Sequence, residues 1–240
     1  MPSARRYPGF PQEGLDFLRK LERNNRREWF QPRKEEFEAS VRKPMLEFAA
    51  ALNKELAGFA PQYMREPENA LYRIYRDTRF SADKTPYKTH IAALFPRIGM
   101  PRNGASGLYV GISRKGVEVA GGVYMPSPED LRRLRTLLAE RHDEFRALLR
   151  KPALGKLMGE LQGEKLTRPP KGWPADHPAA DLLKGKQWYF GVQLDIALAT
   201  TPKLLPEVAA RFRAMAPVVE FLNQAFVGAA ARKGPSALLV

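Results

Sequence analysis

The chain contains no cysteine among its 240 residues. Disulfide bonds, thiolate nucleophiles and cysteine-ligated zinc are therefore excluded, and a reducing compartment suits the composition. Histidine is almost as scarce: His90, His142 and His177 are the three residues of this type, and no H-x-x-x-H or H-E-x-x-H pattern occurs. The sequence therefore predicts no protein-bound metal.

Long apolar segments and nucleotide-binding loops are also missing. No window approaches the roughly 18 uninterrupted apolar residues that cross a bilayer, and the N-terminus lacks the apolar region of a secretory signal. We therefore expect a cytoplasmic protein that does not contact a membrane. No P-loop, G-x-G-x-x-G or G-x-S-x-G is present. We accordingly expect no cofactor, and a serine hydrolase is disfavoured.

Positive charge is abundant, with 40 Lys and Arg against 26 Asp and Glu and a formal net charge of +14. A surface of this kind attracts polyanions, so salt-sensitive contact with nucleic acid is expected. The arginines are spread over almost every segment, however, and total charge alone does not indicate a dedicated nucleic-acid role. A small anionic ligand and a nucleic acid both stay open as partners.

Apolar residues recur with a helical period of about 3.6 in the N-terminal and C-terminal parts of the chain. Prolines mark the places where such helices begin, divide or bend, because proline fits a first helical turn and disturbs an interior one. Ser127 is a suitable N-cap for one helix. The pattern predicts helices over 15–21, over 30–56 with divisions at Pro32 and Pro44, over 128–150, after Pro152, and over 205–226 with a bend at Pro217.

In the middle of the chain the apolar period changes to two, which is typical of strands with one buried face. Between two of these strands lies Ser113-Arg114-Lys115-Gly116, whose glycine can supply the positive φ of a hairpin connection. The adjacent Gly121 and Gly122 indicate a close approach of backbone, a bulge, or packing under an aromatic ring such as Tyr124 or Trp188, and packing is the preferred interpretation. The predicted strands are 71–76, 91–95, 107–113, 117–124 and 187–194.

This order of elements predicts an α+β fold, with a largely antiparallel sheet of about five strands packed against N- and C-terminal helices. No linker is long enough to divide the chain. We therefore expect a single domain over residues 1–230, followed by a flexible tail over 231–240.

Charged residues are densest between Arg73 and Tyr87. Within residues 71–90, five Lys and Arg oppose two Asp, an excess of three positive charges. Guanidinium groups bind carboxylate or phosphate through paired hydrogen bonds, lysine adds a compact charge, and a tyrosine hydroxyl can donate to the same anion. The segment therefore predicts an anion site in a basic cleft, formed by Arg73, Arg76, Arg79, Lys84 and Tyr87.

Asp77 and Asp83 are predicted to position the arginines of this segment, Asp83 through an Asx-type turn. The same residues also allow a structural interpretation, in which the arginines pair with these and other carboxylates and pin a loop against the sheet. Because the local carboxylates are too few to neutralise the segment, the two interpretations stay open side by side.

A second basic stretch, from Arg168 to Lys186, contains Arg168 and Lys171 close to Trp173. Basic and aromatic side chains interleaved in this way can line a wall of an anion site. We therefore add Arg168 and Lys171 to the predicted ligand contacts and expect the ligand between the two stretches. A solvated loop docked by its tryptophan is the competing interpretation.

Candidates for catalysis are few, and the sequence does not decide whether the protein is an enzyme. His177, which lies near Asp176 and Asp181, and Asp77 are the weak candidates for a general base. The interpretation of His177 as a loop residue that caps a helix near Pro178 is preferred. Any reaction would be that of a metal-independent hydrolase or transferase that relies on electrostatic stabilisation.

The residues from Arg73 to Tyr87 read R-x-x-R-D-x-R-F-x-x-D-K-x-x-Y. This pattern resembles the signature of a family known as domain of unknown function 2461. Three further motifs in the expected order resemble that family: Asn24-Asn25 with Trp29-Phe30, Gly121 to Pro126, and Arg168 to Trp173 with Asp176-His177-Pro178. The resemblance covers most of residues 14–226 and implies no particular activity.

Overall fold

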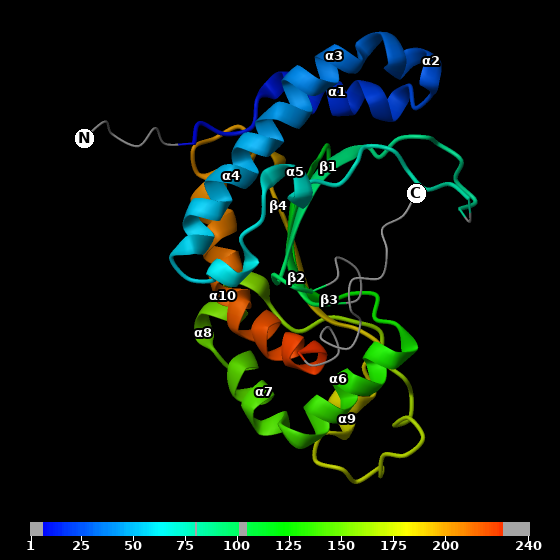
Figure 1. The fold of residues 1–240 in the computed structure, drawn as a ribbon, viewed down its shortest axis with the longest axis vertical. Helices are drawn as coiled ribbons and strands as arrows, with labels where there is room; N and C mark the ends of the chain where they lie inside the picture. The colour runs from blue at the N-terminus through cyan, green and yellow to red at the C-terminus, as the bar shows by residue number, and fades with distance from the viewer. Residues whose placement is uncertain (1–6, 80, 101–104, 228–240) are drawn as a thin grey trace. The chain divides into compact units, whose positions relative to one another are not determined.

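The computed structural model describes residues 7–79, 81–100 and 105–227. One antiparallel sheet has the strand order β1-β2-β3-β4 (Figure 1). The predicted α+β class is confirmed, with four strands instead of about five. The predicted tail over 231–240 lies outside the described residues. The strands are β1 (His90–Pro96), β2 (Gly107–Ser113), β3 (Gly116–Val123) and β4 (Trp188–Leu194).

Helices precede, interrupt and follow the sheet (Figure 1). None of those in the described part of the chain is long and apolar enough to span a bilayer. Before β1 come α1 (Gln12–Arg23), α2 (Arg27–Phe30), α3 (Lys34–Phe37), α4 (Lys43–Ala57) and α5 (Pro67–Ala70). Between β3 and β4 lie α6 (Pro128–Glu140), α7 (His142–Leu149), α8 (Pro152–Met158) and α9 (Ala180–Leu183), and α10 (Leu204–Asn223) follows β4.

The chain forms two compact units whose segments alternate along the sequence. Unit 1 consists of Met1–Phe95, Tyr109–Val119 and Val192–Ala210. Unit 2 consists of Pro96–Leu108, Ala120–Gly191 and Arg211–Val240. The single domain over 1–230 stays a prediction.

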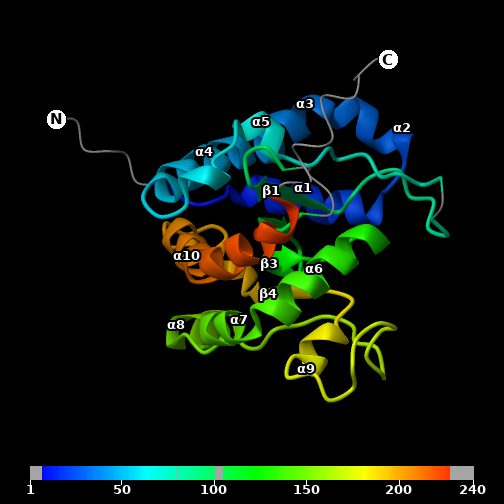
Figure 2. The ribbon, with the colours of Figure 1, turned by 60° about the horizontal axis from the view of Figure 1, so that its bottom comes forward.

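In unit 2, the helix predicted over 128–150 is two helices. The N-cap is confirmed, because the hydroxyl of Ser127 accepts a hydrogen bond of 3.2 Å from the backbone N–H of Asp130. The helix is interrupted at Arg141, whose φ of −131° is not helical. Helix α6 lies beside α9 (Figure 2). The Arg135 guanidinium fixes this contact by donating to the carbonyls of Leu183 and Gly185 at 3.0 and 2.9 Å.

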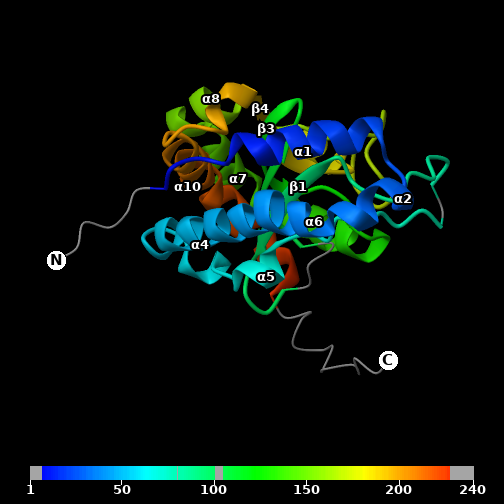
Figure 3. The same cartoon turned by 90° about the horizontal axis from the view of Figure 1, so that it is seen from above.

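In unit 1, a helical run from Arg27 to Ala57 changes its hydrogen-bonding pattern at both prolines. Pro32 lies in a 3₁₀ segment, and Pro44 lies in the first turn of α4, directly after a π-helical turn over Glu38–Arg42. The predicted divisions are therefore confirmed, because both prolines occupy places where a missing N–H is tolerated. Helix α1 lies beside this run (Figure 3).

The strands alternate between an apolar and a polar face, as their period of two predicts. Side chains of one face are fully buried, such as Val110 and Ile112 of β2 and Val119 of β3. The positive φ of Gly116, 133°, confirms the hairpin connection between β2 and β3. The opposite face carries polar side chains from all four strands, including His90, Tyr109, Glu118 and Gln193.

The strand predicted over 71–76 is wrong. This stretch is extended but makes only two isolated antiparallel bridges, Leu71 with Ala93 and Tyr75 with Tyr87. Four residue steps separate the bridges on one side and six on the other, so a continuous ladder cannot stay in register. The segment therefore contacts β1 only at its start, through Leu71 and Tyr72, and continues as an irregular arm.

Candidate functional site

The two ends of the predicted anion segment are tied together inside unit 1. Around the Tyr75–Tyr87 bridge, the N–H of Arg76 donates to the Pro86 carbonyl at 2.9 Å, and that of Lys88 donates to the Ile74 carbonyl at 2.8 Å. The described residues between these two contacts, 77–79 and 81–85, therefore belong to a loop whose ends are held together. We call this stretch, residues 73–88, the basic arm.

Asn25 holds the basic arm through a pair of hydrogen bonds that sequence reasoning did not predict. Its side-chain amide donates to the carbonyl of Tyr87 at 2.9 Å and accepts from the N–H of Tyr87 at 3.0 Å. The asparagine side chain thus takes the place of a neighbouring strand. Phe30 stacks on the Tyr87 ring, with centroids 4.1 Å apart and planes inclined by 26°. The motif that contains Asn25 and Phe30 and the segment from Arg73 to Tyr87 are therefore in direct contact.

Tyr87 is buried, with 1% of its surface exposed. Burial raises the pKa of its hydroxyl. The ring packs among the aromatic side chains of unit 1 and anchors the arm there, while the predicted role of the hydroxyl in orienting a ligand stays a prediction. The prediction missed this because a family signature does not distinguish a ligand contact from a packing contact.

Within the loop, the two aspartates are used as predicted, to position the arginines and the turn. Asp83 accepts from the backbone N–H of Thr85 at 2.9 Å, which confirms the Asx-type turn, and its other oxygen binds the Arg76 guanidinium. Asp77 accepts from the Arg79 side chain at 3.0 and 2.8 Å. Both local carboxylates are therefore occupied by an arginine each.

Arg73 and Lys84 are not matched by a carboxylate. The Lys84 amine donates to the Thr78 carbonyl at 2.9 Å, and the exposed Arg73 guanidinium makes no hydrogen bond or ion pair within residues 7–79, 81–100 and 105–227. The excess positive charge counted in the sequence therefore persists in the fold. It is presented on the surface of the arm, where a dissolved anion can reach it.

Both aspartates of the arm are expected to titrate near pH 2. Hydrogen bonds from the Arg79 side chain and backbone lower the pKa of Asp77 to about 2. Those from Thr85 and then Arg76 lower the pKa of Asp83 to about 2. A depressed carboxyl pKa stabilises the folded arm above the ordinary value near 3.9, and that contribution is lost as the pH falls toward about 2.

Carbon-detected NMR titration of the carboxyl groups measures these midpoints. Replacing Arg79 by alanine is expected to raise the midpoint of Asp77 toward its ordinary value and to leave that of Asp83 in place. Wild-type midpoints of about 4 for both groups would show that the arm is not held by these contacts.

In unit 2, the structure leaves the predicted contacts Arg168 and Lys171 exposed on the segment before α9. Neither side chain forms a hydrogen bond or ion pair with another residue in the described ranges. These two residues belong to unit 2 and the basic arm to unit 1. A ligand placed between the two stretches stays a prediction.

The weak catalytic candidates occupy structural positions. The Nδ1 atom of His177 accepts from the N–H of Ala179, the residue directly before α9, at 3.0 Å, and so fixes the loop that leads into this helix. Asp77 has both carboxylate oxygens engaged by Arg79, and its low pKa makes it a poor proton acceptor near neutral pH. A catalytic role for either residue stays a prediction.

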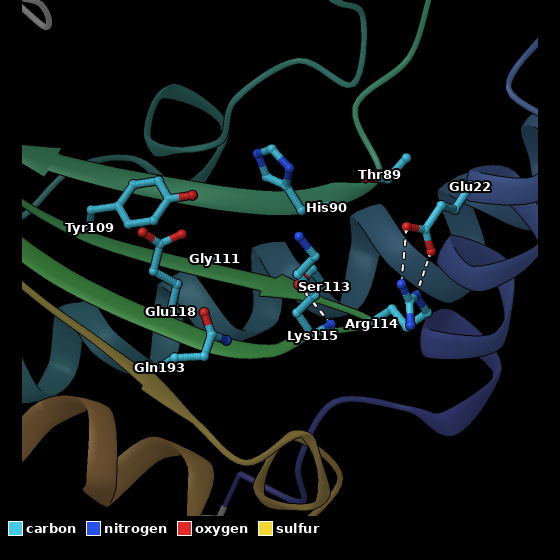
Figure 4. A pocket seen from close by; sticks show the side chains of 10 residues that line it. All are labelled: Glu22, Thr89, His90, Tyr109, Gly111, Ser113, Arg114, Lys115, Glu118 and Gln193. Atoms are coloured by element: carbon cyan, nitrogen blue, oxygen red, sulfur yellow. Dashed lines mark hydrogen bonds and ion pairs between the residues drawn. The ribbon is translucent and has the colours of Figure 1, made fainter. Parts of the chain in front are cut away.

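A cavity of about 200 Å³ lies on the polar face of the sheet in unit 1 (Figure 4). Tyr109, Glu118 and Gln193 project into it from three strands, and the Glu22–Arg114 ion pair, 2.6 Å long, lies at its edge. Gly111 leaves room for the phenol, since a Cβ there would lie 2.6 Å from the Tyr109 hydroxyl. The remaining lining residues are Thr89, His90, Ser113 and Lys115.

Sequence reasoning missed this cavity, although the polar residues that alternate along the strands were a usable signal. Burial raises the pKa of Tyr109, and the nearby Glu118 carboxylate adds to the effect. Burial also lowers the pKa of His90, with smaller contributions from the positive charges of Lys88 and Arg76. At neutral pH the phenol and the imidazole are therefore both uncharged.

The protein is of the α+β class, with a four-stranded antiparallel sheet and helices from both ends of the chain. Its basic arm is held by the side chain of Asn25. The family model described as "Conserved hypothetical protein (DUF2461)" matches residues 13–221. The chain therefore belongs to this family of unknown function, which is the one that its motifs resemble. Neither the curated proteins nor the solved structures contain a significant match to the chain.

Proposed function

We propose that the protein binds a small phosphate- or carboxylate-bearing ligand through the basic arm. The observation that carries the proposal is that Arg73 and Lys84 have no carboxylate partner in the described residues, while Asp77 and Asp83 are taken by other arginines. A guanidinium and an ammonium on one arm can bind the same anion by charge-assisted hydrogen bonds.

The ion pairs of the arm support a positioning role and weaken the purely structural alternative. The Asp83 and Asp77 side chains are 54% and 44% exposed. Exposed ion pairs contribute little to stability, because water solvates the separated charges nearly as well. Loss of Arg76 would therefore not strand a buried carboxylate, which the structural alternative requires. The pairs instead hold the loop in the shape that presents the remaining charge.

Titration calorimetry with inorganic phosphate tests the proposal. Arg73→Ala and Lys84→Ala are each expected to weaken phosphate binding about tenfold or more, since each removes one charge-assisted contact. Lys54→Ala, which removes an exposed lysine from α4 of the same unit, serves as the matched control and should leave binding unchanged.

Two other outcomes would overturn the proposal. A polynucleotide-binding module would bind short oligonucleotides with an affinity that falls steeply with salt and depends little on any single arginine. A scaffold without a ligand would bind neither phosphate nor oligonucleotide, in the wild type or in any variant.

A further inference from the structure

The cavity on the polar face of the sheet carries two charged groups that the fold does not pair. The Glu118 carboxylate and the Lys115 ammonium each make no side-chain hydrogen bond or ion pair with any residue that the structure describes. The other charged lining residues, Glu22 and Arg114, neutralise each other through contacts of 2.6 and 3.4 Å. One negative and one positive charge are therefore available to an occupant.

The uncharged groups around these two charges are hydrogen-bonding groups. Tyr109 and Gln193 flank Glu118 on the adjacent strands, and Ser113 and Thr89 supply hydroxyls (Figure 4). His90 contributes an imidazole that is neutral at pH 7, because burial and neighbouring cations lower its pKa. The lining as a whole carries no net charge, so a simple anion would meet the unpaired carboxylate of Glu118 as well as the ammonium of Lys115.

From this charge distribution we infer that the cavity binds a small zwitterion of the α-amino acid class, with its ammonium group on Glu118 and its carboxylate on Lys115. A zwitterion is the occupant that pairs both charges at once, whereas an anion or a cation leaves one of them facing a like charge. The hydroxyl and amide groups of Tyr109, Gln193 and Ser113 then contact the remaining polar atoms of the ligand. This site is separate from the basic arm and needs no phosphate.

The size of the cavity fits such a ligand. A volume of about 200 Å³ equals the space of about seven water molecules in the liquid, at about 30 Å³ each. It lies below the range of roughly 300–1,000 Å³ that is usual for drug-sized ligands. A single amino acid is of the right order to fill this volume.

Thermal-shift screening against each of the twenty protein amino acids, followed by calorimetry on the strongest binder, tests the inference. We expect saturable binding of at least one amino acid. The corresponding carboxylic acid without the amine and the corresponding amine without the carboxylate should each bind about tenfold more weakly or worse, because each loses one ion pair.

Two variants that each remove one charge test which group of the ligand Glu118 and Lys115 bind. Glu118→Gln is expected to reduce the affinity for the amino acid to that for its deaminated acid, and Lys115→Met is expected to reduce it to that for the decarboxylated amine. Glu68→Gln and Lys54→Met alter exposed residues of the same unit that do not line the cavity, and both should bind like the wild type. Phosphate binding by the basic arm should survive Glu118→Gln, so failure of one proposal is distinguishable from failure of the other.

The absence of binding by all twenty amino acids would overturn the inference. So would an affinity that Glu118→Gln and Lys115→Met leave unchanged, since the ligand would then lie elsewhere on the protein.

Discussion

Tyr87→Ala is expected to lower the free energy of unfolding by roughly 3–5 kcal/mol, the cost of truncating a large buried aromatic side chain. The ring is 1% exposed and stacks on Phe30, and Tyr75 lies against it with centroids 5.5 Å apart. Truncation leaves a cavity at the point where the basic arm joins the helical part of unit 1. Urea denaturation monitored by circular dichroism measures the loss.

Tyr124→Ala is the control for this change, because Tyr124 is 58% exposed. Its truncation should alter stability only slightly, since an exposed side chain buries little surface on folding. A loss for Tyr87→Ala that is no larger than the loss for Tyr124→Ala would contradict the anchoring role. Such a result would return the Tyr87 ring to the list of groups that a ligand can contact.

Gly122→Ala is expected to destabilise the protein by about 3 kcal/mol or more, because two costs combine there. The residue has a φ of 128°, which side chains with a Cβ rarely adopt. A Cβ would also lie 2.6 Å from the Tyr189 Cα and collide with the Trp188 carbonyl oxygen, on the backbone of β4. Neither backbone can yield without breaking the contact between β3 and β4.

Gly172→Ala separates the cost of the positive φ from the cost of the close contact with β4. Gly172 has a φ of 94°, and a Cβ there would meet nothing within 4 Å. Its replacement should therefore cost only the backbone term of about 1–2 kcal/mol. Thermal unfolding of both variants in parallel gives the difference, and equal losses would mean that the close approach of the two strands has no energetic weight.

The strands of the sheet could be predicted because their signal is local. Alternation of Val117 and Val119 with Glu118, or of Trp188 and Phe190 with Tyr189, follows directly from the geometry of a strand with one buried face. The Asx-type turn at Asp83 was predictable for the same reason, since the bond from Thr85 spans two residues.

The basic arm could not be predicted, because a distant residue determines its conformation. Asn25 is 62 positions from Tyr87 in the sequence, and its side chain replaces the strand that a regular sheet would supply. Without that contact, the apolar alternation over 71–76 favours a strand. The helix over 128–150 was likewise predicted as continuous because its apolar residues keep their spacing across the break at Arg141.

The candidate site also has one part that could be predicted from the sequence and one part that could not. The sequence shows the excess charge of the arm and the roles of Asp77 and Asp83, because both depend on neighbours within the loop. It does not show that Tyr87 is buried, because the partner ring, Phe30, comes from a separate motif. The cavity also escaped prediction, because its residues gather only when four strands and the end of α1 are assembled.

The most direct test of the account is to locate where an anion binds. Inorganic phosphate titrated into the ¹⁵N-labelled protein should shift the side-chain Nε–H resonance of Arg73 and the backbone amides of residues 77–85 more than any others, and these shifts should vanish in Arg73→Ala. Shifts confined to other parts of the chain, or none at all up to millimolar phosphate, would contradict the claim that the arm presents unpaired positive charge for a ligand.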